Sequence, residues 1–309
     1  MVTSASFTLL ESTHWTDYAL LDSGGGLKLE RFGEYVFVRP ESQAMWRRSL
    51  TAEWKNADAV FVPTGEESGG HWDIKKKMEE KWQMKYILDP SQVERGELKF
   101  WTMTTPGRHL GVFPEVAAHW DWFSGLIHHR VHREHREANV LNLFGYTGLA
   151  TLAAAAAGAK VTHVDASKKS VSWARENQGL SNLADKPIRW IVDDALKFVQ
   201  REARRGVKYD GIILDPPKFG RGPKGEVWEV YKSLPGLLEA CRECLSNDPL
   251  FVVTTIYAVR ASAIHVAQAM EDMMDGFGGM IEMGELVTRE QSAGRLLSQA
   301  VYARWEQEL

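Results

Sequence analysis

The residues with the clearest chemical potential lie in the segment YDGIILDPPKFGRG. An apolar run typical of a buried strand ends there in the carboxylate of Asp215, and two prolines and a lysine follow it. Proline fixes the backbone φ angle at about −65° and supplies no N–H, so the directions of nearby carbonyls are fixed. Such a rigid turn beside a carboxylate can orient a flat substrate for direct displacement at carbon, where orientation supplies much of the acceleration. We expect catalytic roles for Asp215, Pro216, Pro217 and Lys218.

A second group of residues, beginning in the segment NLFGYTG, has the spacing of a nucleoside-binding site. Gly145 and Gly148 permit a tight turn and a close approach of the backbone to a ligand. Asp165 ends the next strand, where a carboxylate can accept hydrogen bonds from both hydroxyls of a ribose. Asp193 and Asp194 end the strand after that, where an adenine edge would lie. Open α/β sheets bind ligands at these carboxyl ends.

The same residues leave two classes of cofactor open. A pyrophosphate is usually bound by a G-x-G-x-x-G run, but position 143 is Leu and the turn carries Tyr146 and Thr147. A cofactor without phosphates, such as S-adenosylmethionine (SAM), fits this turn better. An NAD-linked oxidoreductase remains the alternative from a different enzyme class.

Alternating strands and helices from residue 139 onward must position both sites. Apolar or β-branched runs at 139–144, 160–165, 187–194, 209–215 and 249–256 predict strands, and the segments between them have helical patterns. This alternation predicts a parallel sheet with helices on both faces. Two further strands, near 280–288 and 298–305, have a short connection and suit an antiparallel hairpin.

Residues from about 100 to 309 resemble the class I SAM-dependent methyltransferases. They are most similar to the bacterial large-subunit ribosomal RNA methyltransferases, the group that contains cytosine carbon-5 and guanine N7 enzymes. The matching segments are GRHLGVFPE (107–115), VLNLFGYTGLATLAAAAAGA (140–159), VDASKKSVSWARENQGLS (164–181), DDALKFV (193–199) and YDGIILDPPKFGRG (209–222).

The resemblance implies an α/β fold with a Rossmann-like, seven-stranded methyltransferase sheet in residues 106–309, its last strand antiparallel. It implies SAM as the cofactor and places Phe113 in a loop that closes over it. The cofactor-binding residues implied in this way are Phe113, Asn142, Phe144, Gly145, Thr147, Gly148, Asp165, Ala166, Ser167, Asp193, Asp194 and Asp215.

The positions of the cysteines indicate which kind of atom receives the methyl group. Methylation of cytosine carbon-5 needs a thiolate, which family members carry after the fifth strand or directly after the prolines. Those places read TTIYAVR (254–260) and DPPKF and contain no cysteine, while Cys241 and Cys244 lie upstream on a helix and suit buried packing. We therefore expect transfer to a nitrogen or an oxygen.

Residues 1–105 are predicted to form a smaller β-rich domain, a possible substrate-recognition element. Strands are expected at 27–40, 57–64 and 98–107, and the tryptophans before residue 105 are expected in its core. The RNA-binding PUA domain frequent in the family is not recognisable. RNA is the expected partner, because residues 197–224 hold eight Lys or Arg against three acidic residues. The residues expected to contact RNA are Arg204, Arg205, Phe219, Arg221 and Lys224.

Composition limits the remaining classes of function. The net charge of −4 argues against indiscriminate coating of nucleic acid, and no apolar run is long enough for a membrane span. With two cysteines, no metal-ligand spacing and no signal-peptide pattern, we expect a cytoplasmic enzyme without a metal. A protein or small-molecule methyltransferase and a non-catalytic SAM- or RNA-binding module remain open.

Overall fold

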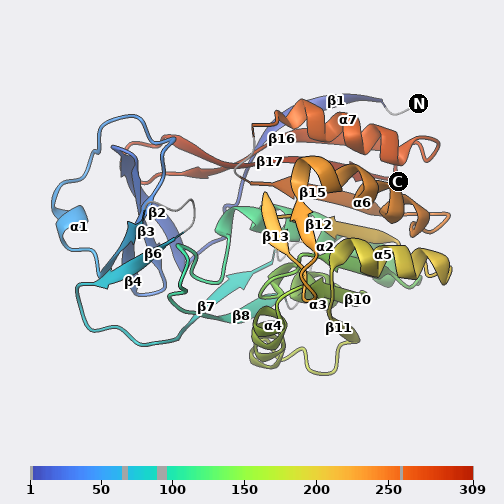
Figure 1. Cartoon of the computed structure of the whole chain (residues 1–309), viewed down its shortest axis with the longest axis horizontal. Coiled ribbons are helices and arrows are strands. Elements are labelled where there is room, and N and C mark those ends of the chain that lie inside the picture. Colours follow the sequence, from blue (N-terminus) through green and yellow to red (C-terminus); the bar gives the residue numbers. More distant parts are fainter. Residues whose placement is uncertain (1–2, 65–68, 89–95, 258–259, 309) are drawn as a thin grey trace.

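A twisted eight-stranded sheet forms the centre of the larger part of the molecule (Figure 1). The computed structural model describes residues 3–64, 69–88, 96–257 and 260–308. The strands follow the order β1-β16-β17-β15-β12-β9-β10-β11 across the sheet. Their bounds are β1 (Thr3–Glu11), β9 (Asn139–Leu143), β10 (Lys160–Asp165), β11 (Ile188–Val192), β12 (Gly211–Leu214), β15 (Phe251–Ile256), β16 (Met280–Arg289) and β17 (Leu296–Glu306).

Seven of these strands confirm the predicted methyltransferase sheet, and the last strand of the chain, β17, is antiparallel to both its neighbours. The eighth strand, β1, was expected in the small N-terminal domain. It pairs instead in parallel with β16 at the edge of the large sheet. Leu10 of β1 packs there against Leu286 and Tyr302, so burial of its side chain stabilises the pairing.

Helices cover both faces of the sheet, as predicted. Adjacent strand residues point to opposite faces: Ile213 and Val253 pack with α2 and α3, whereas Ile212 and Val252 pack with α5, α6 and α7. The helices are η1 (Pro114–Val116), α2 (Ala117–His128), η2 (His129–Arg133), α3 (Leu149–Ala156), α4 (Lys168–Leu180), α5 (Ala195–Arg204), α6 (Val230–Glu243) and α7 (Ala263–Met274). No helix in the described ranges combines the length and hydropathy that a membrane crossing requires.

The smaller part of the molecule is a five-stranded sheet followed by a hairpin, as the β-rich prediction indicated (Figure 1). The expected strand 27–40 is two strands, because Gly33 adopts a left-handed turn with φ 64°. The elements are β2 (Tyr18–Gly24), β3 (Leu27–Phe32), β4 (Tyr35–Pro40), α1 (Ala52–Lys55), β5 (Ala59–Pro63), β6 (Gly70–Ile74), β7 (Trp82–Ile87) and β8 (Glu97–Thr102).

The β7–β8 hairpin joins the two parts of the molecule. The backbone N–H of Trp101 donates to Asn177 Oδ1 at 2.9 Å, and that of Lys99 donates to Ser181 Oγ at 3.0 Å, so β8 is fixed along α4. Trp82 and Trp120, one from each part, contribute to the same hydrophobic core. The boundary at residue 105 remains a prediction.

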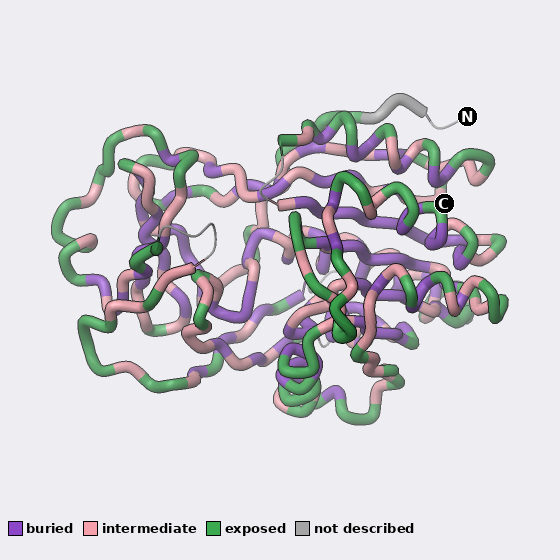
Figure 2. Tube along the Cα trace, in the orientation of Figure 1, coloured by how far each residue is buried: buried purple, intermediate pink, exposed green. Residues whose placement is uncertain are grey.

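Exposed residues concentrate at the outer surfaces of the helices and in one projecting hairpin (Figure 2). This hairpin consists of β13 (Phe219–Arg221) and β14 (Val227–Glu229) and directly follows the DPPK segment. The segment between the predicted strands 209–215 and 249–256 was expected to be helical, but its helix begins only at Val230, after the paired segment.

Candidate active site

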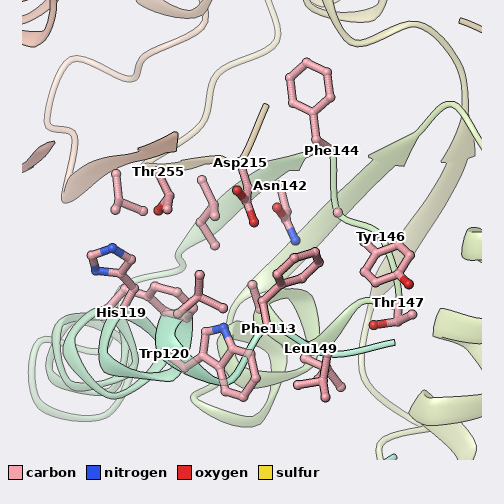
Figure 3. Close-up of a pocket in the computed structure, with 17 residues that line it drawn as sticks. Phe113, His119, Trp120, Asn142, Phe144, Tyr146, Thr147, Leu149, Asp215 and Thr255 are labelled. Atoms are coloured by element: carbon pink, nitrogen blue, oxygen red, sulfur yellow. The ribbon is translucent and has the colours of Figure 1, made fainter. Parts of the chain in front are cut away.

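A pocket opens at the carboxyl ends of β9, β12 and β15, where the sequence predicted a ligand site (Figure 3). Its empty space, including open solvent at the mouth, is about 550 Å³. None of its described lining residues is Lys or Arg, which suits a ligand without phosphates. Six predicted cofactor residues line it: Phe113, Asn142, Phe144, Gly145, Thr147 and Asp215.

The turn after β9 has a strained backbone. Phe144 and Tyr146 are left-handed, with φ 59° and φ 47°, a conformation that costs a non-glycine residue on the order of 1–3 kcal/mol. The amide of Gly145 donates to the Val164 carbonyl at 3.1 Å, and the amide of Tyr146 donates to Asp165 Oδ2 at 2.9 Å. Strain held in place at a pocket is typical of ligand-binding turns.

The two glycines of this turn are needed for reasons that differ in part from the expectation. Gly148 has φ 85°, which confirms the tight turn. The backbone also approaches other parts of the protein closely at these positions, and its approach to a ligand remains a prediction. A Cβ on Gly145 would lie 2.4 Å from the His163 ring, and one on Gly148 would lie 2.7 Å from Ala174. Packing of the turn against β10 and α4 therefore requires glycine at both positions.

Asp165 is held in one orientation by two backbone amides. Oδ2 accepts from Tyr146, and Oδ1 accepts from the amide of Ser167 at 2.8 Å. Each carboxylate oxygen keeps a further lone pair that can accept from a ribose hydroxyl. Burial raises the pKa of Asp165, an effect that the two amides oppose. Its ribose contact, and cofactor binding by the neighbouring Ala166, remain predictions.

Asp193, Asp194 and Ser167 each have a structural partner and do not line the pocket. Asp193 pairs with Arg201 at 2.6 Å between Oδ2 and Nη2. Asp194 caps α5 by accepting from the amide of Lys197 at 3.0 Å, and the Ser167 hydroxyl caps α4 in the same way. The predicted adenine contact of Asp193 or Asp194 stays a prediction.

Asp215 ends β12 between Asn142 of β9 and Thr255 of β15 and faces the pocket (Figure 3). Protein surrounds its carboxyl, although the pocket leaves part of the residue accessible. Burial, together with the nearby Glu115 carboxyl, raises the pKa of Asp215 to about 8. Burial also raises the pKa of Glu115, which is 6% exposed. Asp215 is therefore largely protonated at neutral pH before a ligand binds.

The prolines hold Asp215 next to the β13–β14 hairpin, but one of their carbonyls is already in use. The indole N–H of Trp228 donates to the Pro217 carbonyl at 2.7 Å, and the amide of Val230 donates to the Lys218 carbonyl. The Pro217 carbonyl therefore anchors the hairpin, which Trp228 further fixes by packing against Phe144 at 4.8 Å between ring centroids.

The residues predicted to contact RNA fall into two groups. Phe219, Arg221 and Lys224 lie exposed on the β13–β14 hairpin beside the DPPK segment. Arg204 and Arg205 lie exposed at the carboxyl-terminal end of α5. That helix begins at the pocket edge of the sheet and runs about 15 Å away from it. The structure thus brings the first group, and not the second, next to the site.

Four lining residues with polar side-chain groups were not predicted as site residues: His119, Trp120, Tyr146 and Thr255. Trp120 also packs in the hydrophobic core. His119 precedes it on the same helix, and a histidine amid apolar residues was the one available signal. Phe113 lines the pocket, and its ring contacts Tyr146 and Tyr257; its closing over the cofactor remains a prediction.

Neither cysteine lines the pocket. Cys241 and Cys244 are buried on α6 and at its end, as predicted, and burial raises the pKa of both thiols. Among the described residues, no group of three or more His, Cys, Asp or Glu is arranged to hold a metal ion.

Comparison with known proteins identifies the family. A model described as Conserved hypothetical protein 95 matches residues 123–227. The large-subunit ribosomal RNA methyltransferase K/L of Pseudoalteromonas atlantica is 36% identical over 86 residues, which are 28% of this chain. Methyltransferase I of Klebsiella pneumoniae is 37% identical over 60 residues, 19% of this chain. The matches span only 12% and 15% of these two relatives.

A solved structure extends the similarity to the whole chain. The crystal structure of a SAM-dependent methyltransferase from Agrobacterium tumefaciens is 45% identical, with a TM-score of 0.89. The match covers 100% of this chain and 98% of that one. Because it includes the pocket, the DPPK segment and the N-terminal sheet, this protein belongs to the SAM-dependent methyltransferases and uses SAM as its cofactor.

Proposed function

We propose that this protein transfers the methyl group of SAM to a nitrogen or an oxygen of RNA. Ribosomal RNA is the proposed substrate, because the names of its relatives refer to it. The curated relatives that it matches are large-subunit ribosomal RNA methyltransferases. The observation that carries the proposal is the β13–β14 hairpin, an exposed aromatic and basic element mounted rigidly beside Asp215.

The two faces of the hairpin differ in exposure. Gly220 and Trp228 pair on the inner face, where Trp228 is 4% exposed. Phe219, at 56% exposed, shares the outer face with Arg221 and Val227. An exposed aromatic ring can stack on an unpaired base, and adjacent cations can neutralise phosphates.

The tip of the hairpin is also fixed in place. Lys197 of α5 pairs with Glu226 at 2.7 Å, and Glu226 accepts from the amide of Lys224. The hairpin is therefore held at its base by Trp228 and at its tip by Glu226. A rigid surface of this kind limits the entropy that is lost when a substrate binds.

Transfer to an acceptor that carries an N–H or O–H needs one basic group on the protein. Bound SAM would supply an electrophilic methyl group on a positively charged sulfur. The acceptor would bond to that methyl while the methyl–sulfur bond breaks and its electron pair stays on sulfur as neutral S-adenosylhomocysteine, and the acceptor would give up its N–H or O–H proton. The Asp215 carboxylate can accept this proton while it orients the acceptor. Since the thiols of Cys241 and Cys244 lie buried on the far side of β12, a covalent cysteine route is not part of this proposal.

The direct test is incubation of the enzyme with tritium-labelled SAM and fractionated cell extract. We expect the incorporated label to become acid-soluble after nuclease treatment and to survive protease treatment. Label that protease releases would establish a protein substrate instead. Label in small-molecule fractions only would equally overturn the RNA assignment.

The hairpin cations should determine RNA affinity. For Arg221→Ala/Lys224→Ala we expect RNA affinity to fall roughly tenfold and the log–log salt slope to lose about one unit per cation. Fluorescence anisotropy with a labelled ribosomal RNA fragment at several salt concentrations would measure both. Lys160→Ala is the matched control, because Lys160 is an exposed lysine at the opposite end of β10. An unchanged slope in the double variant would contradict this surface as the RNA site.

Binding of SAM should depend on pH through Asp215. The pKa of about 8 means that the carboxyl keeps its proton below that pH in the free protein. The positive charge of SAM favours the ionised carboxylate, so binding releases the proton. The affinity for SAM should then rise by at most roughly tenfold per pH unit up to about pH 8. Above that pH it should level off.

Calorimetry between pH 6 and pH 9 would measure this dependence as the ratio of SAM affinity to that of S-adenosylhomocysteine, which lacks the positive charge on sulfur. In Asp215→Asn the ratio should no longer follow the titration seen in the wild type. A ratio that is equally pH-dependent in this variant would assign the titration to another group.

A further inference from the structure

The inner end of the pocket contains two polar side chains that the fold leaves unpaired. His119 is 3% exposed and Trp120 is 2% exposed, and both belong to α2 and line the pocket (Figure 3). Within the described part of the chain, neither ring nitrogen of His119 has a hydrogen-bond partner, and neither has the indole N–H of Trp120. Buried polar groups nearly always have partners, so unpaired ones in a pocket point to a ligand.

The type of these groups indicates what the ligand must offer. An indole N–H only donates, and a neutral imidazole donates through one nitrogen. His119 is neutral, because burial lowers the pKa of its ring well below the usual value and the nearby Arg304 lowers it further. Arg304 lies near His119 but pairs with Glu282 at 3.1 Å, so its charge is compensated there. Two unpaired donors suit an anionic acceptor.

The size of this end excludes a polymer. Its walls are core residues: Phe123 is 0%, Val253 is 1% and Ile213 is 6% exposed. A nucleotide chain or a peptide cannot enter such a space, but the end group of a small molecule can. No Lys or Arg lines it, so a singly charged carboxylate fits better than a phosphate.

Asp215, which becomes negatively charged when it loses its proton, lies elsewhere in the same pocket. In Figure 3 it lies across the pocket from Trp120, and Tyr146 and Thr147 of the turn lie on the side away from His119. The amino-acid part of SAM carries an ammonium and a carboxylate. We propose that Trp120 Nε1–H and one ring N–H of His119 bind the carboxylate of SAM, so that its ammonium lies toward Asp215. This inference concerns the cofactor and holds whichever acceptor the enzyme methylates.

The test compares SAM with decarboxylated SAM, which keeps the sulfonium and the ammonium but lacks the carboxylate. In His119→Leu and in Trp120→Phe, calorimetry should show SAM affinity about tenfold or more lower, the size of a lost hydrogen bond to a charged group. Affinity for decarboxylated SAM should stay within roughly twofold of the wild type. His119→Gln, which restores an N–H, should recover part of the loss for SAM.

Trp122→Phe is the matched control, since the Trp122 indole on the same helix already donates to Glu306 at 2.9 Å. It should leave both ligands unaffected. Equal losses for both ligands in the His119 and Trp120 variants would overturn the proposal, because they would reflect general damage to the pocket. Unchanged SAM affinity would overturn it too, and would indicate that these N–H groups donate to ordered water.

A measurement on the wild-type protein covers the case in which a variant fails to fold. With ¹⁵N-labelled tryptophan, the indole N–H resonance of Trp120 should move on addition of SAM, since it gains an acceptor. It should move much less on addition of decarboxylated SAM. The same shift with both ligands would contradict a contact with the carboxylate.

Discussion

Asp215→Asn should lower kcat by roughly 10²–10⁴-fold, the range measured for loss of a positioned general base. Asparagine keeps the size and the hydrogen-bonding capacity of the neutral acid but cannot take a proton. Because the pKa of about 8 leaves Asp215 largely protonated near pH 7, asparagine resembles the residue as the free protein holds it. The affinity of Asp215→Asn for SAM at that pH should therefore differ from the wild type by roughly tenfold or less. The main effect of the substitution should be the lower kcat.

Single-turnover kinetics with saturating SAM and RNA would separate this loss from binding. Asp185→Asn, an exposed carboxylate between α4 and β11, is the matched control and should leave kcat unchanged. If Asp215→Asn raised the KM for RNA and left kcat intact, Asp215 would contribute to uniform binding of the substrate and not to proton transfer.

The parts of the fold that could be predicted are those that local sequence determines. The run Ile212-Ile213-Leu214 is apolar on both faces, and the structure buries it between two layers of helices. A strand buried on both faces must be central and, between helices, parallel. This reasoning located the carboxyl end of β12, and with it Asp215, from a few neighbouring residues.

The position of β1 could not be predicted in this way. Its partner β16 is separated from it by most of the chain, and the choice of edge depends on the assembled sheet. The hairpin β13–β14 was missed for a related reason. Its short strands depend on the Trp228 indole reaching the Pro217 carbonyl, a tertiary contact that no local propensity indicates.

Aspartates at strand ends show a different limit. Asp165 and Asp194 both follow an apolar strand and precede a helix, so their sequence contexts are alike. The structure separates them: Asp194 caps α5, whereas Asp165 fixes the strained turn at Tyr146. An N-cap and a ligand-binding carboxylate use the same residue type at the same kind of position. Only the direction of the side chain distinguishes the two.

Asp165→Ala should weaken SAM binding by roughly a hundredfold, because two hydrogen bonds from the ribose hydroxyls to a charged acceptor are lost, on the order of 3 kcal/mol. Calorimetry would measure the affinity, and unchanged SAM affinity would contradict the ribose assignment. The variant also removes the acceptor of the Tyr146 amide, so the left-handed turn loses one of its supports. Two causes could therefore produce the same loss.

Asp165→Asn separates these causes. Its single carbonyl oxygen can keep either the Tyr146 amide or the Ser167 amide, while the NH₂ group can only donate. If the ribose contact dominates, Asn should bind SAM nearly as weakly as Ala, because the negative acceptor is gone in both. If the support of the turn dominates, Asn should recover affinity together with the melting temperature. Equal melting temperatures with unequal affinities would place the effect at the ligand, where the second lone pair of each Asp165 oxygen is available.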